Sequence, residues 1–447
     1  MRRRTFTGTI TAAAALTLLA GLAPAATADG TDRASGHHDR AYRTVGYFTQ
    51  WGVYGRDFQV KDLDTSGTAA KLTHINYAFG NVSPEGECFT GNVPGEADAW
   101  ADYARPLDAA GSVDGVADTG TQPLAGNFNQ LRELKAKHPG LKVMISLGGW
   151  SWSTHFSDAA RTAASRKALV KSCIELYIKG NLPVDGARGG EGAAAGLFDG
   201  IDLDWEWPGS AGDTDTVHRP EDKRNFTALV HEFRTQLDAH ARSSRKGKPK
   251  HYELSAFVPT APAKIDAGFD VPRIMRDFDF VNLQGYDFHV SGEATTAQQS
   301  ALYAKGDFSV DQTVRDWIRR GAPARKLVMG MPFYGQGWTG VTGGGDGLGQ
   351  PAAAPAPATY AAGYEDYKAL KKLAGSGKFE VHRDARNGHA WLFDGSTLWT
   401  YDDPSVLRAK TSYIRDRGLG GAMFWSLDGD TDDGELMTAV DRGLRRH

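Results

Sequence analysis

The chain has 447 residues, of which 40% are hydrophobic and 23% are charged. This length and composition allow one large or two medium globular domains and exclude a chain that is disordered throughout. Its 51 Lys and Arg residues against 54 Asp and Glu residues give a formal net charge of −3, and this slightly acidic balance argues against a nucleic-acid-binding protein.

The N-terminus has the pattern of a secretory signal peptide. Arginines at residues 2–4 precede an apolar run over 10–22, and a small-residue stretch ends at Ala28. We therefore predict a signal peptide over 1–28 and a secreted, extracellular protein, with twin-arginine export as an alternative route. The run is shorter than the roughly 18 apolar residues that span a membrane, so we expect no membrane anchor. The polar residues 29–41 are predicted to be a flexible lead-in.

Eight short runs of apolar and β-branched residues follow along the chain, and each is predicted to be a buried strand. They cover residues 44–49, 72–80, 141–147, 197–205, 252–258, 278–286, 327–333 and 420–426. Several stretches between them have helical periodicity, for example Phe226, Leu229 and Phe233. Strand followed by helix, eight times over, predicts an α/β fold, a closed (β/α)8 TIM barrel built from 42–338 and 400–447. A doubly wound open sheet is the alternative, although no Gly-rich phosphate-binding turn follows the first strand.

Two connections are much longer than the others, over 81–126 and 335–419. A minimal barrel needs about 250 residues, so the surplus lies mainly in these connections. Within the second, a Gly, Ala and Pro-rich loop precedes a short helical pattern and three strand-like runs. We predict a small α+β insertion subdomain over 339–399, after the seventh strand, where it would deepen a cleft at the carboxyl end of the barrel.

The chain has two cysteines, Cys88 and Cys173. In an oxidising compartment they could form one disulfide. Cys173 also lies on an apolar helical stripe with Leu169 and Leu176, where a free cysteine packs as a small hydrophobic residue. The sequence leaves both alternatives open.

Acidic residues concentrate on the fourth predicted strand. Side chains alternate along a strand, so Asp202, Asp204 and Glu206 share one face, which in a barrel points inward. Like charges in a dry site raise at least one pKa, and such an arrangement usually marks function. Glu206 is nearest the carboxyl end of the strand, where barrel active sites lie, and is predicted to be a general acid. A divalent-metal site and a structural carboxyl network are the alternatives from spacing alone.

The residues 199–206 match the pattern Asp-x-x-Asp-x-Asp-x-Glu, and in this the chain resembles glycoside hydrolase family 18, the chitinase family. The third strand ends in Ser146-Leu-Gly-Gly, the sixth in Tyr286-Asp287, and the eighth carries Trp425, all similar to family motifs. Over residues 43–445 the chain looks most like secreted actinobacterial members with a chitinase-insertion domain.

The resemblance implies hydrolysis of β-1,4 linkages in chitin and N-acetylglucosamine oligosaccharides by a retaining, substrate-assisted mechanism. Glu206 is then the general acid and base, and Asp204 orients the acetamido group and stabilises the oxazolinium intermediate. Asp202 shares charge or a proton with Asp204, Tyr286 donates a hydrogen bond to the acetamido carbonyl, and Asp199 is a structural support. No metal or cofactor is implied, and we expect a monomer.

Further residues are predicted to bind substrate or to support the acids. Trp425 would form the cleft floor, with Asp287 beside Tyr286, and apolar ring faces suit sugars. The others are Trp150, Trp207 and Trp338 as cleft residues, Tyr47 and Ser146 as partners of the acids, and Gln284, which stands where many members have Met. Core packing or a turn is the simpler interpretation of the aromatic and serine residues taken singly. A relative acting on N-linked glycans and an inactive lectin remain alternative functions.

Overall fold

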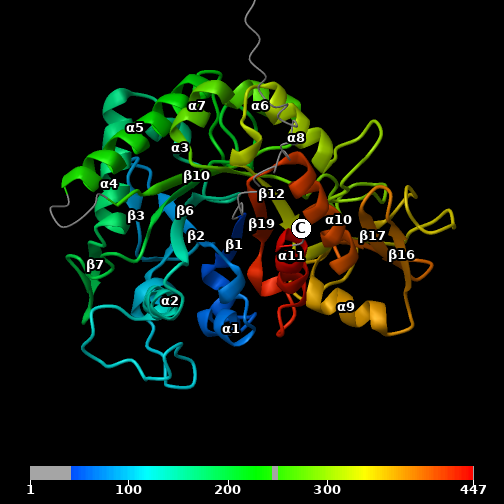
Figure 1. The fold of residues 1–447 in the computed structure, drawn as a ribbon, viewed down its shortest axis with the longest axis horizontal. Helices are drawn as coiled ribbons and strands as arrows, with labels where there is room; N and C mark the ends of the chain where they lie inside the picture. The colour runs from blue at the N-terminus through cyan, green and yellow to red at the C-terminus, as the bar shows by residue number, and fades with distance from the viewer. Residues whose placement is uncertain (1–41, 244–249, 446–447) are drawn as a thin grey trace, which may run out of the picture. The chain divides into compact units, whose positions relative to one another are not determined.

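A computed structural model describes residues 42–243 and 250–445 (Figure 1). The predicted signal peptide over 1–28 and lead-in over 29–41 lie outside the described residues. No helix within the described ranges is both long enough and apolar enough to cross a membrane.

Eight parallel strands form a closed ring (Figure 1). Strand β1 pairs with both β2 and β19, which closes the barrel and excludes the open sheet. Around the ring they are β1 (Arg43–Thr49), β2 (His74–Val82), β6 (Lys142–Gly148), β9 (Gly200–Asp204), β10 (Glu253–Val258), β11 (Val281–Leu283), β12 (Leu327–Pro332) and β19 (Gly421–Trp425). Each overlaps one of the eight runs predicted from sequence, which confirms the barrel.

Helices surround the barrel in the connections between its strands (Figure 1). The predicted stripe of Phe226, Leu229 and Phe233 is buried on α5 and faces the barrel core. The helices are α1 (Val60–Thr65), α2 (Gly126–Lys137), α3 (Phe156–Ala159), α4 (Ala163–Cys173), α5 (Asp222–Ser243), α6 (Pro262–Gly268), α7 (Val271–Asp277), α8 (Val310–Arg319), α10 (Pro404–Arg417) and α11 (Glu435–Arg445).

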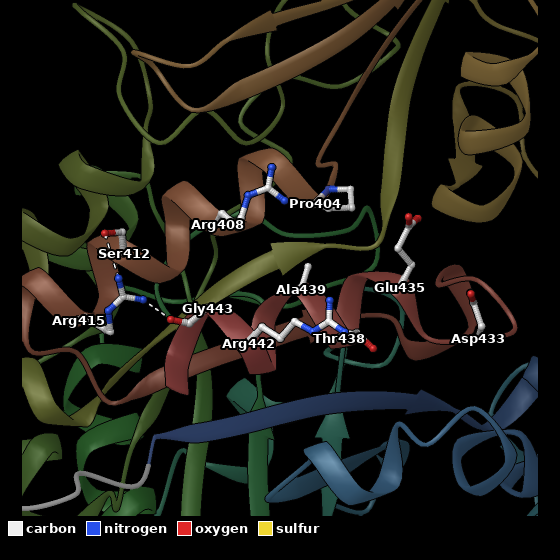
Figure 2. A pocket seen from close by; sticks show the side chains of 10 residues that line it. All are labelled: Pro404, Arg408, Ser412, Arg415, Asp433, Glu435, Thr438, Ala439, Arg442 and Gly443. Carbon is white, nitrogen blue, oxygen red and sulfur yellow. Dashed lines mark hydrogen bonds between the residues drawn. The ribbon is translucent and has the colours of Figure 1, made fainter. Parts of the chain in front are cut away.

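The two last helices, α10 and α11, pack side by side and enclose a hollow of about 600 Å³ (Figure 2). Arg415 of α10 spans it and donates hydrogen bonds to the carbonyl of Gly443 and, at 3.3 Å, to Ser412 Oγ. Arg408 and Arg442 line the same hollow. None of the residues predicted for the functional site lines it, so that site lies elsewhere.

The connection after β2 carries three short strands, β3 (Cys88–Phe89), β4 (Asn92–Val93) and β5 (Ala97–Asp98), and a further hairpin precedes β9, formed by β7 (Leu182–Asp185) and β8 (Arg188–Gly190). Cys88 forms a disulfide with Cys173 at the end of α4, and the Cys88 N–H donates to Ser172 Oγ at 2.9 Å. Of the two alternatives for the cysteines, the disulfide is therefore the one observed. It ties the long first connection to the helix layer.

The connection after β12 folds as an antiparallel sheet with one helix, α9 (Tyr367–Gly375). Its strand order is β14-β13-β18-β17-β16, and β15 pairs with β13. The strands are β13 (Tyr334–Thr339), β14 (Ala354–Pro355), β15 (Tyr364–Asp366), β16 (Glu380–Asp384), β17 (His389–Phe393) and β18 (Leu398–Tyr401). The sheet thus extends beyond the predicted range 339–399 at both ends. It begins earlier because β13 follows barrel strand β12 almost directly, and it ends later because β18 continues to Tyr401.

Candidate active site

A cavity of about 850 Å³ opens at the carboxyl ends of the barrel strands. Its walls come from the barrel-strand ends, the two long connections and α6. The predicted site residues that line it are Tyr47, Trp150, Asp204, Glu206, Trp207, Gln284, Tyr286, Asp287 and Trp425. Sequence positions up to 378 apart, Tyr47 and Trp425, thus meet in one site.

The alternation along β9 determines which of its side chains enter the cavity. Asp202 and Asp204 are 0% and 3% exposed on the inner face, and Glu206 lies two positions beyond the last strand residue, at the cavity wall. Trp205 faces outward instead and stacks on Phe156, with ring centroids 5.6 Å apart. The strand therefore delivers its acids to one side and packs its apolar residues against the helices, as predicted.

Asp202 is held by donors from four other strands. Tyr47 Oη donates to it at 2.7 Å, Ser146 Oγ at 2.8 Å, Ser255 Oγ at short range and Asn282 Nδ2 at 3.4 Å. Burial raises the pKa of Asp202, although these hydrogen bonds oppose the rise. The predicted contacts of Tyr47 and Ser146 with the acids are present, and no hydrogen bond joins Asp202 to Asp204.

Asp204 is electrostatically different from Asp202. No described residue donates a hydrogen bond to its carboxyl group, and its Oδ1 is fully buried. Burial raises its pKa well above the ordinary value, and the neighbouring carboxyls of Glu206 and Asp202 raise it further. This carboxyl therefore has a free acceptor at the cavity and a strong tendency to keep or share a proton.

Glu206 has the properties of a general acid. Burial raises its pKa to about 8, with the charge of Lys264 lowering it and that of Asp287 raising it. Its backbone N–H donates to Ser153 Oγ at 2.8 Å, and Ser153 donates in turn to the carbonyl of Gly149 at 2.8 Å. The residue is thus fixed through its backbone and holds a proton at neutral pH.

Tyr286 and Asp287 stand beside the acids at the end of β11. Among residues 42–243 and 250–445, the Tyr286 hydroxyl has one weak partner, Met423 Sδ at 3.9 Å. Burial and the nearby Asp204 raise the pKa of Tyr286, so its hydroxyl stays a donor. Asp287 accepts hydrogen bonds from Tyr334 Oη at 2.7 Å and Gln336 Nε2 at 2.9 Å.

Aromatic rings cover much of the cavity. Trp425 lies 5.3 Å from Tyr47 between ring centroids and stacks on Phe79 at 5.7 Å. Trp150 is 48% exposed at the cavity rim, whereas Trp207 is buried in the wall against Phe257. Gln284 also lines the cavity, and its Oε1 accepts from Thr260 N at 3.4 Å.

Trp338 does not line this cavity, and the interpretation of it as a cleft residue is wrong. It is fully buried in the small core of the insertion, with Val341, Trp391 and Leu398. Its Nε1 donates to the carbonyl of Glu293 at 3.1 Å. Trp338 shares a face of β13 with Tyr334, which lines the cavity, but it lies four residues further along the strand, where the insertion core covers it.

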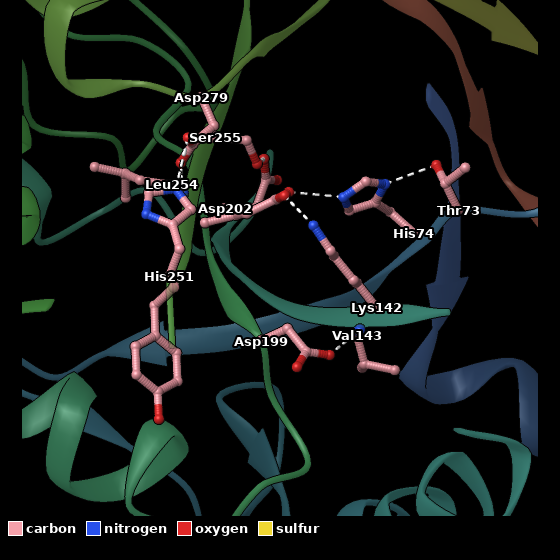
Figure 3. Close-up of polar contacts among 12 residues, drawn as sticks. Thr73, His74, Lys142, Val143, Asp199, Asp202, His251, Leu254, Ser255 and Asp279 are labelled. Atoms are coloured by element: carbon pink, nitrogen blue, oxygen red, sulfur yellow. Dashed lines mark hydrogen bonds and ion pairs between the residues drawn. The ribbon is translucent and has the colours of Figure 1, made fainter. Parts of the chain in front are cut away.

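Asp199 lies at the opposite end of β9 from Glu206, in a polar cluster (Figure 3). Its carboxylate pairs with Lys135 Nζ at 2.6 Å and Lys250 Nζ at 2.7 Å and accepts from Val143 N at 3.0 Å. Burial alone would raise its pKa, but the two ammonium groups bring it below the ordinary value. Asp199 does not line the cavity. Its two ion pairs agree with the structural supporting role that we expected for it.

The sequence interpretation missed several residues of the site. Lys264 of α6 lines the cavity, although a lysine on a short helix usually indicates solvent. Ser255 and Asn282 could have been found, because alternation along their strands places them on the inner face. The other missed lining residues include Trp51, Phe79, Trp152, Tyr334 and Tyr364.

In the ranges 42–243 and 250–445, no group of three or more His, Cys, Asp or Glu side chains is arranged to hold a metal ion. The acids of β9 are instead surrounded by hydroxyl, amide and aromatic groups.

Comparisons with known proteins agree with this geometry. The chain is 40% identical over 412 residues to Chitinase 63 of Streptomyces plicatus, covering 90% of this chain and 60% of the relative. It is 34% identical over 429 residues to Chitinase A1 of Niallia circulans, covering 87% of this chain and 57% of the relative. The chain thus spans about three fifths of the length of these curated relatives.

Among solved structures, the catalytic domain of psychrophilic chitinase B from Arthrobacter TAD20 has a TM-score of 0.86 and 48% identity, covering 90% of this chain and 95% of that one. The chitinase ChiA74 from Bacillus thuringiensis has a TM-score of 0.75 and 31% identity, covering 90% and 70%. The family model for glycosyl hydrolases family 18 matches residues 43–430. On these grounds the chain belongs to glycosyl hydrolase family 18.

Proposed function

We propose that this protein is a secreted chitinase, which hydrolyses β-1,4 linkages in chitin and N-acetylglucosamine oligosaccharides with Glu206 as general acid and base. The observation that carries this is a matched donor and acceptor beside Glu206. Asp204 offers a carboxyl that has no hydrogen-bond partner in the described part of the chain, and Tyr286 offers a hydroxyl whose partner is weak. An acetamido group has one N–H and one C=O, so it can satisfy both at once.

The arrangement supports a substrate-assisted, retaining reaction. Glu206 gives its proton to the glycosidic oxygen while the acetamido oxygen attacks C1, and the C1–oxygen bond to the leaving sugar breaks. The oxazolinium that forms is cationic, and the carboxylate of Asp204 stabilises it. Glu206, now ionised, takes a proton from water as the water attacks C1. This attack opens the oxazolinium ring and restores the acetamido group. Asp202, held by four hydrogen bonds, lies beside Asp204 on the inner face of β9 and shares charge or a proton with it.

The other predicted residues have supporting roles in this proposal. Tyr47 and Ser146 hold Asp202, and Asp287 steadies the sugar beside Tyr286. Trp425 forms the floor, Trp207 a wall and Trp150 the rim, with Gln284 contacting the sugar from the strand end. Export from the cell agrees with the Cys88–Cys173 disulfide, since disulfides persist in oxidising compartments. No cofactor is needed, and we propose that the enzyme acts as a monomer.

The experiment is hydrolysis of colloidal chitin, N-acetylglucosamine oligomers and an N-linked glycan by the protein from residue 29 onward. We expect short oligomers from chitin, formed first as the β-anomer, and at least a thousandfold lower turnover for Glu206→Gln. Cleavage of the glycan alone, or binding of chitin without hydrolysis by the wild type, would overturn the proposal. Products formed first as the α-anomer would overturn the mechanism.

A further inference from the structure

Lys264 is a half-buried cation in the wall of the active-site cavity. It lies on α6, directly after β10, and its Nζ is 5.2 Å from the ring centroid of Trp207. Of the described side chains that line the cavity, Lys264 is the only Lys, Arg or His, and the cavity also contains the carboxyls of Asp204, Glu206 and Asp287. Glu206 is the acid whose charge acts on Lys264. One positive charge therefore shares the cavity with three acids.

The charge of Lys264 is not neutralised elsewhere. It makes no ion pair with any carboxylate in the part of the chain that the structure describes. The acid on its own helix, Asp266, is already paired with Arg320, which directly follows α8, at 2.7 and 2.8 Å. Lys223 of α5 donates to the Asp266 carbonyl at 2.9 Å. A long lysine could reach water, yet Lys264 lies against an indole ring inside the cleft, where cation–π attraction stabilises it.

We propose that Lys264 is a positioning residue that acts through Glu206. The ammonium charge of Lys264 sets the upper end of the pH range in which the Glu206 carboxyl can act as an acid. The inference rests on the proposed glycosidase function of the same site. When Glu206 loses its proton, its carboxylate shares the cavity with the acids Asp204 and Asp287, which disfavour a further negative charge. Lys264 is the one described lining cation that offsets this charge repulsion.

The electrostatics of the two groups agree with this geometry. Burial raises the pKa of Glu206 to about 8, and Lys264 acts against that rise. Burial lowers the pKa of Lys264, and the charge of Glu206 acts against that fall. Besides Asp204 and Asp287, the titratable groups that line the cavity are Tyr47, Tyr286, Tyr334 and Tyr364. All four tyrosines have raised pKa values, so they stay neutral.

The test compares Lys264→Met, which removes the charge, with Lys264→Arg, which keeps it. Lys223→Met is the matched control, since it removes a neighbouring cation outside the cavity. The measurement is kcat/KM against pH for a soluble N-acetylglucosamine tetramer. We expect the alkaline limb to move upward by about one pH unit in Lys264→Met and to stay in place in the other two. An unmoved limb with a raised KM would overturn the proposal and leave Lys264 as a sugar contact.

A second readout needs no turnover. The side-chain carboxyl of Glu206 is titrated by ¹³C NMR in selectively labelled protein, with Glu206→Gln to assign its signal. Its midpoint should rise by about one pH unit in Lys264→Met and stay in place in Lys264→Arg. Equal midpoints in Lys264→Met and wild type would overturn this inference alone, whereas a wild type that hydrolyses no chitin would overturn the proposed function alone.

Discussion

The two ends of strand β9 carry the same side chain in opposite environments. Asp199, just before the strand, pairs with Lys135 and Lys250. Asp204, at its other end, accepts no hydrogen bond from any described residue and has other acids as its neighbours. The pKa of Asp199 is below the ordinary value and that of Asp204 well above it. Position along the barrel axis, not residue type, therefore decides whether the charge of an aspartate is stabilised by neighbouring cations or opposed by burial and neighbouring acids.

The same contrast extends to glutamates. Glu253, at the start of β10, accepts from His74 at 2.7 Å and from Lys142 at short range. Burial opposes its ionisation, yet these partners lower its pKa to about 2. Glu206 at the other end of the barrel has a pKa of about 8. At the amino end of the barrel, Asp199 and Glu253 are paired with cationic side chains. At the carboxyl end, Asp204 and Glu206 form no ion pair with a described residue.

The largest effect should come from Asp204→Asn. We expect kcat to fall by about a thousandfold, or about 4 kcal/mol, because the neutral amide cannot stabilise a developing cation. KM should change little. Asp199→Asn, the same substitution at the other end of the strand, should keep its turnover. Steady-state kinetics on the tetramer measures both, and near-normal turnover in Asp204→Asn would remove its assigned role.

At the amino end, Glu253→Gln should cost stability instead of activity. The Glu253 pKa falls from 4.5 to about 2 on folding, which corresponds to about 3 kcal/mol. Because the folded pKa is lowered, this stability is fully present above pH 4.5 and is lost as the pH falls toward 2. Urea denaturation at pH 7 and pH 3 should therefore show a smaller difference from wild type at pH 3. An equal difference at both would contradict the linkage.

Glu206→Gln should have the opposite sign of effect on stability. Its folded pKa is raised from 4.5 to about 8, so the corresponding stability is present below pH 4.5 and is lost as the pH rises through 8. The variant avoids that loss and should gain about 2 kcal/mol on wild type between pH 5 and pH 9, after allowance for solvent in the open cleft. Thermal unfolding at the two pH values measures it; no relative gain would show that ionised Glu206 costs the fold nothing.

The smallest expected effect separates two tryptophans. Trp150→Ala should raise the KM for oligomers by about tenfold or less, because a rim indole contributes about 1 kcal/mol of stacking, and should leave stability unchanged. Trp338→Phe should lower stability and leave KM unchanged, since it acts within the insertion core. An unchanged KM in Trp150→Ala would place sugar binding deeper in the cleft.

The sequence was most informative where burial and alternation act together. The eight barrel strands are continuous apolar runs, and the acids of β9 follow from a period of two. Trp338 was misplaced because nothing local shows where along β13 the cavity ends and the core of the insertion begins. Lys264 was missed because its environment depends on the distant β9. The choice between a disulfide and free cysteines stayed open because the fold of the long first connection is not periodic.

The donors around Asp202 come from β1, β6, β10 and β11. A slip of one residue in any of these strands would turn its side chain to the other face of the sheet and take one donor from the carboxylate. A barrel assembled in the wrong register could be compact and still have a disturbed acid site. Regain of turnover during refolding is therefore a stricter report of correct strand alignment than regain of secondary structure.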